Sequence, residues 1–88
     1  MTPLQYLRRH GGRVSRHKWT FRLHPGRVSR KALARLQDPL VLHRLRTEVW
    51  PEYEDWLERA AIREFCGGQS RTDAERDAFT DIIERSDP

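Results

Sequence analysis

Apolar and polar positions follow a helical period at the start of the chain, then a strand period, and then a helical period again. Leu4 and Leu7 are three residues apart behind a threonine cap and a proline, which predicts a short helix that ends at Gly11. Apolar and polar residues alternate over residues 18–23, and this period of two is typical of a half-buried strand. Residues 14–16 can pair with it, so the pattern predicts a β-hairpin.

The rest of the chain has a helical period and begins after a turn at residues 24–26. Ser29 can cap a helix, and an Asp-Pro pair ends this helix and caps the next. Pro51 either starts another helix or kinks a long one. Thr72 and Glu75 form a capping box for a last helix. The expected fold class is α+β, with a short N-terminal helix, a β-hairpin and a bundle of three to four helices.

The aromatic residues of the predicted strand allow two interpretations. Trp19 and Phe21 lie between Lys18 and Arg22, an arrangement that could stack bases beside phosphate contacts, as in single-strand binders. In a small domain, however, an apolar strand face more commonly forms the core. We therefore expect Trp19, Phe21 and Leu23 to pack on the helix capped by Ser29. This packing leaves the polar face of the strand exposed.

Length and composition predict one folded domain spanning residues 1–88. Apolar residues make up 36% of the chain and charged residues 34%, and eight aromatic side chains separate it from disordered sequences. No apolar run approaches the length of a membrane span, and the N-terminus lacks the apolar core of a signal peptide. Cys66 is the single cysteine, so no internal disulfide is expected, which favours a reducing, cytoplasmic location.

Positive and negative charges are concentrated in opposite portions of the chain. Residues 1–46, the predicted αββα portion, contain twelve Lys or Arg and one acid, for a net charge of +11. Residues 47–88, the predicted helical portion, contain twelve acids and five Arg, for a net charge of −7. A basic portion attracts phosphate or carboxylate partners, and an acidic portion could neutralise it within the molecule or between subunits.

A five-residue sequence, Gly-Arg-Val-Ser-Arg, occurs at residues 12–16 and again at residues 26–30. Its spacing is shorter than the units of solenoid repeats. The favoured interpretation is that each copy is a turn glycine leading into a new element. The alternative is that the two copies are equivalent basic turns on either side of one strand. They would then converge on one anionic partner.

The residues usually found in active sites and metal sites have no convincing arrangement in this sequence. His10, His17 and His24 are seven residues apart, and none of the close ligand spacings of structural zinc sites occurs. Cys66 precedes two glycines at a predicted helix end, where the helix dipole disfavours a thiolate, so a small packed cysteine is expected. No serine has a nucleophile-elbow context. We expect no enzyme activity, no metal site and no cofactor.

The N-terminal portion resembles the docking domains of the TubC type, which are found on nonribosomal peptide and polyketide synthases. The resemblance rests on the Leu4 and Leu7 helix, a glycine break, Val14, the alternating residues 21–23, a Pro-Gly turn and the helix entry at residues 28–29. It implies an αββαα fold whose hairpin edge receives a partner peptide. The chain differs from that family in its high arginine content, and we expect no synthase module after it.

A second resemblance covers residues 58–76, which follow the pattern ERAAI-x-E-aromatic-x-GG-x-S/T-R-x-x-AE. This segment looks like a tail of small proteins from phages and integrated elements. The resemblance implies a mobile-element accessory protein that acts by binding.

These observations favour a non-enzymatic phage or mobile-element protein that binds an acidic host or phage protein. It would be a docking adaptor or a host-directed inhibitor of the anti-CRISPR kind. Nucleic-acid binding by the basic portion is the alternative, although no sequence-reading motif is present. In either case the expected binding residues are basic: Arg13, Arg16, Lys18, Arg22, Arg27, Arg30, Lys31 and Arg35.

A homodimer is a further expectation, because the unequal charge of the two portions makes pairing between copies available. Charge pairing alone would be weak and screened by salt. We favour an apolar seam, because three Trp in 88 residues are more than this core obviously needs. Its expected residues are Trp50, Trp56 and Ile83.

Overall fold

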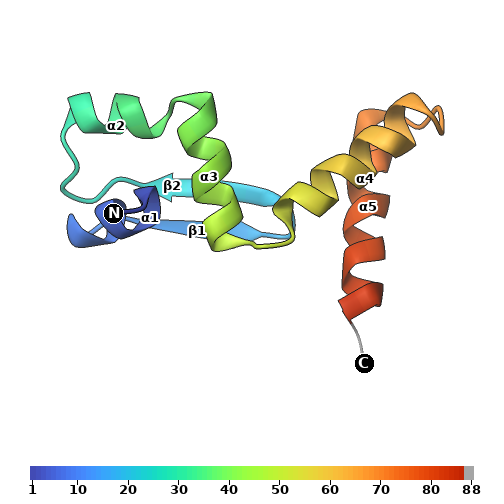
Figure 1. Ribbon diagram of the computed structural model, residues 1–88, viewed down its shortest axis with the longest axis horizontal. Coiled ribbons are helices and arrows are strands. Elements are labelled where there is room, and N and C mark those ends of the chain that lie inside the picture. The colour runs from blue at the N-terminus through green and yellow to red at the C-terminus, as the bar shows by residue number, and fades with distance from the viewer. Residues whose placement is uncertain (87–88) are drawn as a thin grey trace. The chain divides into compact units, whose positions relative to one another are not determined.

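A computed structural model of the chain describes residues 1–86 and contains an antiparallel hairpin and five helices within that range (Figure 1). This confirms the predicted α+β class, the short N-terminal helix and the hairpin. In the described range no helix has the length and apolar character needed to cross a bilayer. The elements are α1 (Pro3–Arg9), β1 (Arg13–His17), β2 (Thr20–His24), α2 (Arg30–Leu36), α3 (Pro39–Val49), α4 (Tyr53–Phe65) and α5 (Arg71–Ser86).

The chain folds into two compact units, Met1–Pro51 and Glu52–Pro88. The first unit contains α1, the hairpin, α2 and α3, and the second contains α4 and α5. The boundary follows Pro51, the residue that the sequence marked as a helix start or kink, and lies five residues beyond the division between the basic and acidic portions. A single cooperative domain over residues 1–88 stays a prediction.

Local capping signals determine where the helices of the first unit begin. The Thr2 hydroxyl accepts a hydrogen bond from the Gln5 backbone N–H, and the Gln5 side chain accepts one from the Thr2 N–H, which is a complete capping box. Ser29 Oγ accepts a hydrogen bond from the Ala32 N–H at the start of α2. Asp38 accepts one from the Leu40 N–H at the start of α3. These three helix starts lie where the sequence places them.

The hairpin has a two-residue turn, because His17 is paired with Thr20. Lys18 in this turn has a φ of 55°, a left-handed conformation that is uncommon outside glycine. Trp19 therefore lies in the turn and not in β2, so the prediction of a strand face containing Trp19 is wrong by one residue. Alternation still separates the hairpin into two faces. We call them the inner face (Val14, Arg16, Phe21, Leu23) and the outer face (Arg13, Ser15, His17, Thr20, Arg22, His24).

The inner face of the hairpin packs against α3. The Phe21 ring lies 6.5 Å from the Trp50 ring, centroid to centroid, and the Arg46 guanidinium lies 5.7 Å from the Phe21 centroid. Leu42 and Leu45 of α3 line a small hollow together with the inner face. The expectation that Phe21 packs on the helix capped by Ser29 is therefore corrected: the supporting helix is the next one, α3.

The glycine repeat adopts two different backbone conformations. In its first copy, residues 13–16 belong to β1, whereas in the second copy residues 26–27 form a turn and Ser29 caps α2. The two copies nevertheless meet. The Arg27 N–H donates to the His10 carbonyl over 2.7 Å. A Cβ added at Gly26 would lie 2.5 Å from the Gly11 backbone, so only glycine allows this close approach.

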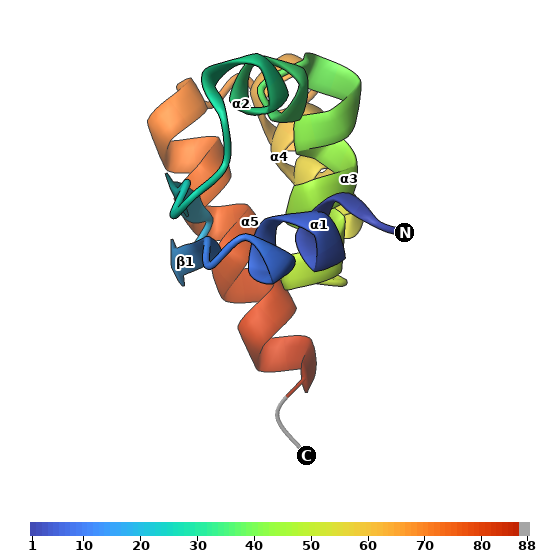
Figure 2. The same cartoon turned by 90° about the vertical axis from the view of Figure 1, so that its left-hand side faces the viewer.

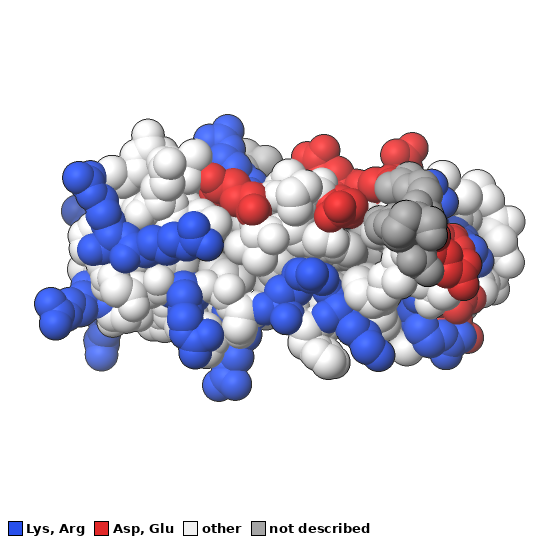
Figure 3. All heavy atoms as spheres, turned by 90° about the horizontal axis from the view of Figure 1, so that it is seen from below, with Lys and Arg blue, Asp and Glu red and all other residues white. Residues whose placement is uncertain are grey.

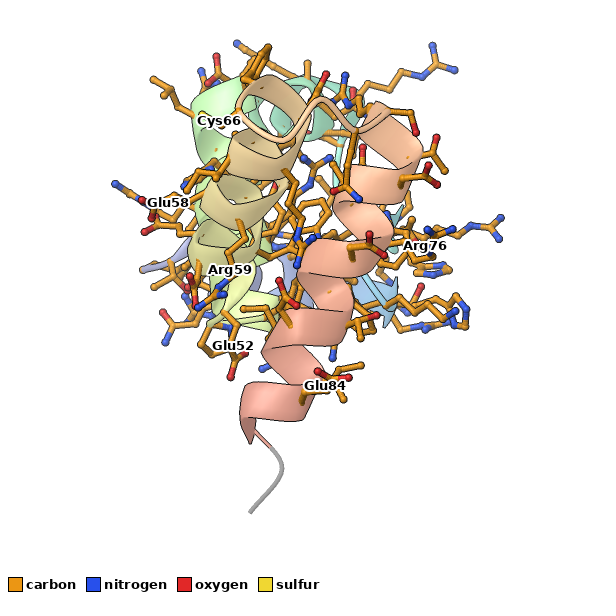
Figure 4. The ribbon with its side chains drawn as sticks, turned by 90° about the vertical axis from the view of Figure 1, so that its right-hand side faces the viewer. Glu52, Glu58, Arg59, Cys66, Arg76 and Glu84 are labelled. Atoms are coloured by element: carbon orange, nitrogen blue, oxygen red, sulfur yellow. The ribbon has the colours of Figure 1, made fainter. Side chains whose placement is uncertain are left out.

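The second unit is an antiparallel pair of helices with small residues at their contact. Ala60, Ala74 and Ala78 are buried, and the Trp56 indole N–H donates to the Glu75 carbonyl over 3.0 Å. Figure 4 shows Glu58 and Arg76 projecting away from this contact. The chain leaves α4 through Gly68, whose φ is 68°.

Ser70 caps α5, because its hydroxyl accepts a hydrogen bond from the Asp73 N–H over 3.2 Å. The predicted capping box at Thr72 and Glu75 is therefore wrong by two residues. Thr72 lies inside the first turn of α5, which begins at Arg71. The Arg71 side chain pairs with Glu75 over 3.1 Å instead.

Candidate functional site

In the first unit, the basic residues that the sequence predicts for binding have no carboxylate partners among the described residues. Of its two acids, Asp38 caps α3 and Glu48 accepts a hydrogen bond from the Leu4 N–H over 3.1 Å. None of the eight basic residues predicted as binding residues forms a salt bridge within residues 1–86. Figure 3 shows Lys and Arg side chains spread over the visible face of this unit. The charge is therefore available to an external anion.

The second unit shows the opposite behaviour, because the four arginines whose side chains are described, Arg59, Arg63, Arg71 and Arg76, all form ion pairs with acids of the same unit. Arg63 of α4 donates to Asp81 of α5 over 2.6 Å, and Asp77 lies 4.0 Å from the same guanidinium. Asp77 also accepts hydrogen bonds from Gln69 and Arg76, and these, the Gln69 amide first, hold its pKa below the ordinary value. The ion pairs of this unit connect α4 with α5 and neutralise its described arginines within the unit.

The eight predicted residues do not form one patch. Arg13 and Arg22 lie on the outer face of the hairpin, and Lys18 lies in its turn. Arg27 lies in the turn after β2. The other four are Arg16 on the inner face and Arg30, Lys31 and Arg35 on α2.

The Arg16 side chain interacts with other residues of the first unit. Its guanidinium carbon lies 4.9 Å from the centroid of the Trp50 ring, and its Nη1 donates to the Lys18 carbonyl over 2.6 Å. A cation placed over a tryptophan ring is stabilised by the ring quadrupole. Because Arg16 lies on the opposite face from Arg13 and Arg22, it does not belong to the same binding surface.

The outer face of the hairpin brings together four polar side chains. The register places Arg13 opposite His24 and Ser15 opposite Arg22. Ser15 Oγ lies 3.0 Å from His24 Nε2. Burial, with the positive charges of Arg13 and Arg22, lowers the pKa of His24 from its ordinary value of 6.5. The imidazole is therefore neutral at pH 7.

Sequence reasoning did not select Ser15 or His24. Strand alternation alone places Ser15 beside Arg13 in β1, but only the register between the strands places His24 with them. Predicting the two-residue turn at residues 18–19 would have supplied that register, because each pairing follows from the turn. A serine and a histidine in contact do not by themselves make a nucleophilic pair, since no third group in the described range is seen to orient His24.

A second surface feature of the first unit is an apolar groove of about 360 Å³ at the junction of α1, α2 and α3. Figure 2 shows α3 running beside α1 and reaching α2 at its upper end. The groove carries two cationic side chains, Arg35 from α2 and Arg44 from α3. The remaining lining residues are mostly apolar: Met1, Thr2, Pro3, Tyr6, Ala32, Leu36 and Val41.

Arg35 was selected from the sequence, but Arg44 and the apolar lining were not. The lining residues are scattered over three helices, so no local spacing connects them. The helix period of α2 places Ala32 and Leu36 on one face, four residues apart, and Arg35 beside them. That this face lines the same groove as α1 is a tertiary feature that the pattern does not contain.

Two of the three residues predicted for an apolar seam between copies are buried inside the monomer. Trp50 is 6% exposed and Trp56 is 5% exposed, so both rings are part of the core. Ile83 is 52% exposed and remains accessible on α5. Trp50 and Trp56 are therefore corrected from seam residues to core residues.

The His and Cys residues considered in the sequence do not assemble into a metal centre in the part of the chain that the structure describes. No three His, Cys, Asp or Glu side chains gather there in a way that could hold a metal ion. Cys66 is exposed at the end of α4 and not packed as expected (Figure 4). The candidate sites of this protein are therefore the groove and the outer face of the hairpin, and both are suited to binding.

Comparisons with protein-family models, curated proteins and solved structures found no match. The resemblance to TubC-type docking domains stays a prediction, and so does the resemblance to the tails of small proteins from phages and integrated elements.

Proposed function

We propose that this chain is a non-enzymatic interaction protein that docks an acidic segment of a protein partner in the groove between α1, α2 and α3. One observation supports the proposal above the others. An apolar groove carries two arginines, Arg35 and Arg44, that have no carboxylate partner among the described residues.

The chemistry of the groove defines the partner. A volume of about 360 Å³ is at the lower end of the range for small-ligand sites and accommodates a large apolar side chain. Such an anchor in a desolvated pocket supplies most of the affinity in many protein interfaces. Arg35 and Arg44 would pair with carboxylates next to that anchor, which add orientation and association rate. The partner segment therefore carries a leucine or an aromatic residue flanked by Asp or Glu.

A charge-reversal experiment tests this proposal. A labelled peptide with one phenylalanine flanked by glutamates is titrated with the protein, and binding is followed by fluorescence anisotropy. We expect Arg35→Glu with Arg44→Glu to weaken binding about tenfold or more, since two attractive pairs become repulsive. Arg30→Glu with Lys31→Glu is the matched control, because it changes the same charge outside the groove lining. Equal losses in the two variants would contradict groove docking.

The biological setting that we propose is a phage or an integrated element. The resemblance of residues 58–76 to tails of small mobile-element proteins supports it. In that setting a docking surface fits an adaptor or a host-directed inhibitor that acts in the cytoplasm. Recovery of a host protein that binds the wild type but not the Arg35→Glu, Arg44→Glu variant would identify the process.

Nucleic-acid binding is a second candidate function, and the outer face of the hairpin favours it. This face carries Arg13 and Arg22 among polar residues and presents no exposed large apolar side chain in the described range. Phosphate binding needs charge and not an apolar anchor, so such a face suits a nucleic-acid backbone. With contacts from Arg13, Arg22 and Arg27, log Kd for an oligonucleotide should change with log salt by about 3. Binding that does not depend on salt would contradict this candidate.

A further inference from the structure

We propose that the outer face of the hairpin contains a binding site for a phosphate group, formed by Arg13, Ser15, Arg22 and His24. The site is separate from the groove, so it does not rest on groove docking. It deepens the second candidate function by naming the side chains and the chemical group that they recognise.

Geometry is the first support for this site. Cross-strand pairing places Arg13 opposite His24 and Ser15 opposite Arg22. These four residues form a square on the outer face, and the two arginines occupy diagonally opposite corners of it. Directly paired side chains on one face of an antiparallel sheet have Cβ atoms about 5 Å apart. The contact of 3.0 Å between Ser15 Oγ and His24 Nε2 lies within the square. Two cations thus flank a pair of neutral hydrogen-bonding groups.

The surroundings of His24 are the second support. On this side of the sheet His24 is paired with Arg13 of β1 and lies two residues after Arg22 of its own strand, whereas His17 lies at the other end of the face. Arg13 and Arg22 both act on it electrostatically, and no described carboxylate does. Arg27 lies in the following turn, whose backbone contacts the chain at residues 10–12. The site therefore gathers positive charge with nothing of opposite sign to balance it.

The number of donors distinguishes phosphate from carboxylate. Each arginine offers a planar set of N–H donors, Ser15 offers a hydroxyl, and a protonated His24 offers further N–H groups. A phosphate group has three strong acceptor oxygens, whereas a carboxylate has two oxygens in one plane. Donors that approach from both strands and from diagonal corners suit the tetrahedral group better.

Binding of the anion should change the protonation of His24. In the unbound protein the two arginines keep the imidazole neutral at pH 7, because they lower its pKa. A bound dianion compensates these charges and favours imidazolium, so the His24 pKa rises when the site is filled. By linkage, the anion must then bind more tightly as the pH falls.

Sulfate is the probe for this linkage, because it keeps its double negative charge between pH 5 and 8. Imidazole NMR signals of the full chain are followed against pH, with and without sulfate, at constant ionic strength set by chloride. We expect the His24 pKa to rise with sulfate, and the signals of His43, which lies on α3 and not on the hairpin, serve as the control. Sulfate affinity should increase by up to tenfold per pH unit in the window between the two His24 pKa values.

Variants distinguish a specific sulfate site from nonspecific attraction of sulfate to positive charge. Arg13→Gln with Arg22→Gln should reduce sulfate affinity at least tenfold, whereas Arg30→Gln with Lys31→Gln removes the same charge elsewhere and should change it less than threefold. His24→Asn should remove the pH dependence of sulfate binding, because the titrating group is absent. Circular dichroism confirms that each variant is folded. A His24 pKa that does not respond to sulfate, or equal losses in both double variants, would overturn the proposal.

Further titrations distinguish the source of the phosphate. Inorganic phosphate, a mononucleotide and an oligonucleotide are compared at pH 7 with the wild type and the Arg13→Gln, Arg22→Gln variant. Tighter binding of the oligonucleotide, lost in the variant, assigns the site to a nucleic-acid backbone and supports the second candidate function. Binding of the small phosphates without a gain from the oligonucleotide supports the site and contradicts that candidate function. Failure of all three in the wild type overturns both.

Discussion

The guanidinium carbon of Arg16 lies 4.9 Å from the centroid of the Trp50 ring. This contact joins the inner face of the hairpin to the residue that ends α3. Phe21, the cross-strand partner of Arg16, lies near the same ring, with its centroid 6.5 Å from that of Trp50. A charged residue that would be assigned to a binding surface by its type therefore helps to hold the hairpin against its supporting helix.

The first prediction concerns this contact. Arg16→Ala should lower the free energy of unfolding by about 1–2 kcal/mol, because it removes the cation–π contact, the hydrogen bond to the Lys18 carbonyl and the packing of the arginine stem. Arg22→Ala, on the exposed outer face, should change it by less than about 0.5 kcal/mol. Urea denaturation measures both. Equal stability of the two variants would contradict a structural role for Arg16.

The second prediction concerns the helix pair α4 and α5. The Trp56 indole N–H donates to the Glu75 carbonyl, and the ring is almost fully buried. Trp56→Phe keeps an aromatic ring but removes this donor and some volume, so it should destabilise the protein by about 1–3 kcal/mol. Ile83→Ala, a truncation at an exposed site on α5, should cost much less. Thermal unfolding followed by circular dichroism gives the comparison.

Short-range signals predicted most of the first unit. Thr2, Ser29 and Asp38 each cap a helix in the structure, because a cap depends only on the few residues that follow it. The period of two around Phe21 predicted β2 for the same reason. At α5 the sequence contains two possible capping residues, Ser70 and Thr72, and in the structure Ser70 caps the helix. Local pattern could not decide between these neighbours.

Long-range packing limited the remaining predictions. The sequence shows that Phe21 needs an apolar surface, but not that α3 supplies it in place of α2. It shows that Trp50 and Trp56 are large and apolar, but not that the monomer buries them. Of the candidate sites, Arg13, Arg22 and Arg35 were predicted. His24 depends on strand register, and Arg44 and the apolar lining of the groove depend on how three helices are arranged.

The third prediction concerns self-association. With Trp50 and Trp56 buried, an apolar seam between copies would have to use exposed residues such as Phe65, which is 80% exposed, and Ile62, which is 53% exposed. We expect sedimentation equilibrium to show a dimer that persists at high salt and that Ile62→Ser with Phe65→Ser makes monomeric. Dissociation of the wild type by salt alone would indicate pairing of unlike charges instead. A monomer under all conditions would contradict both forms of dimer.

The fourth prediction concerns the stability of the protein in mild acid. The His24 pKa is lowered in the folded state, so below its ordinary value of 6.5 the unfolded chain binds this proton more tightly than the folded chain does. Stability should therefore fall as the pH is lowered from about 7 towards 5, and the urea midpoint measures the decrease in a buffer free of phosphate and sulfate. His24→Asn should make the decrease smaller, because the group that titrates is absent. His17→Asn, a change on the same face of the hairpin that leaves His24 in place, should retain the full decrease. If His24→Asn loses stability with pH as steeply as the wild type, His24 is not the group responsible.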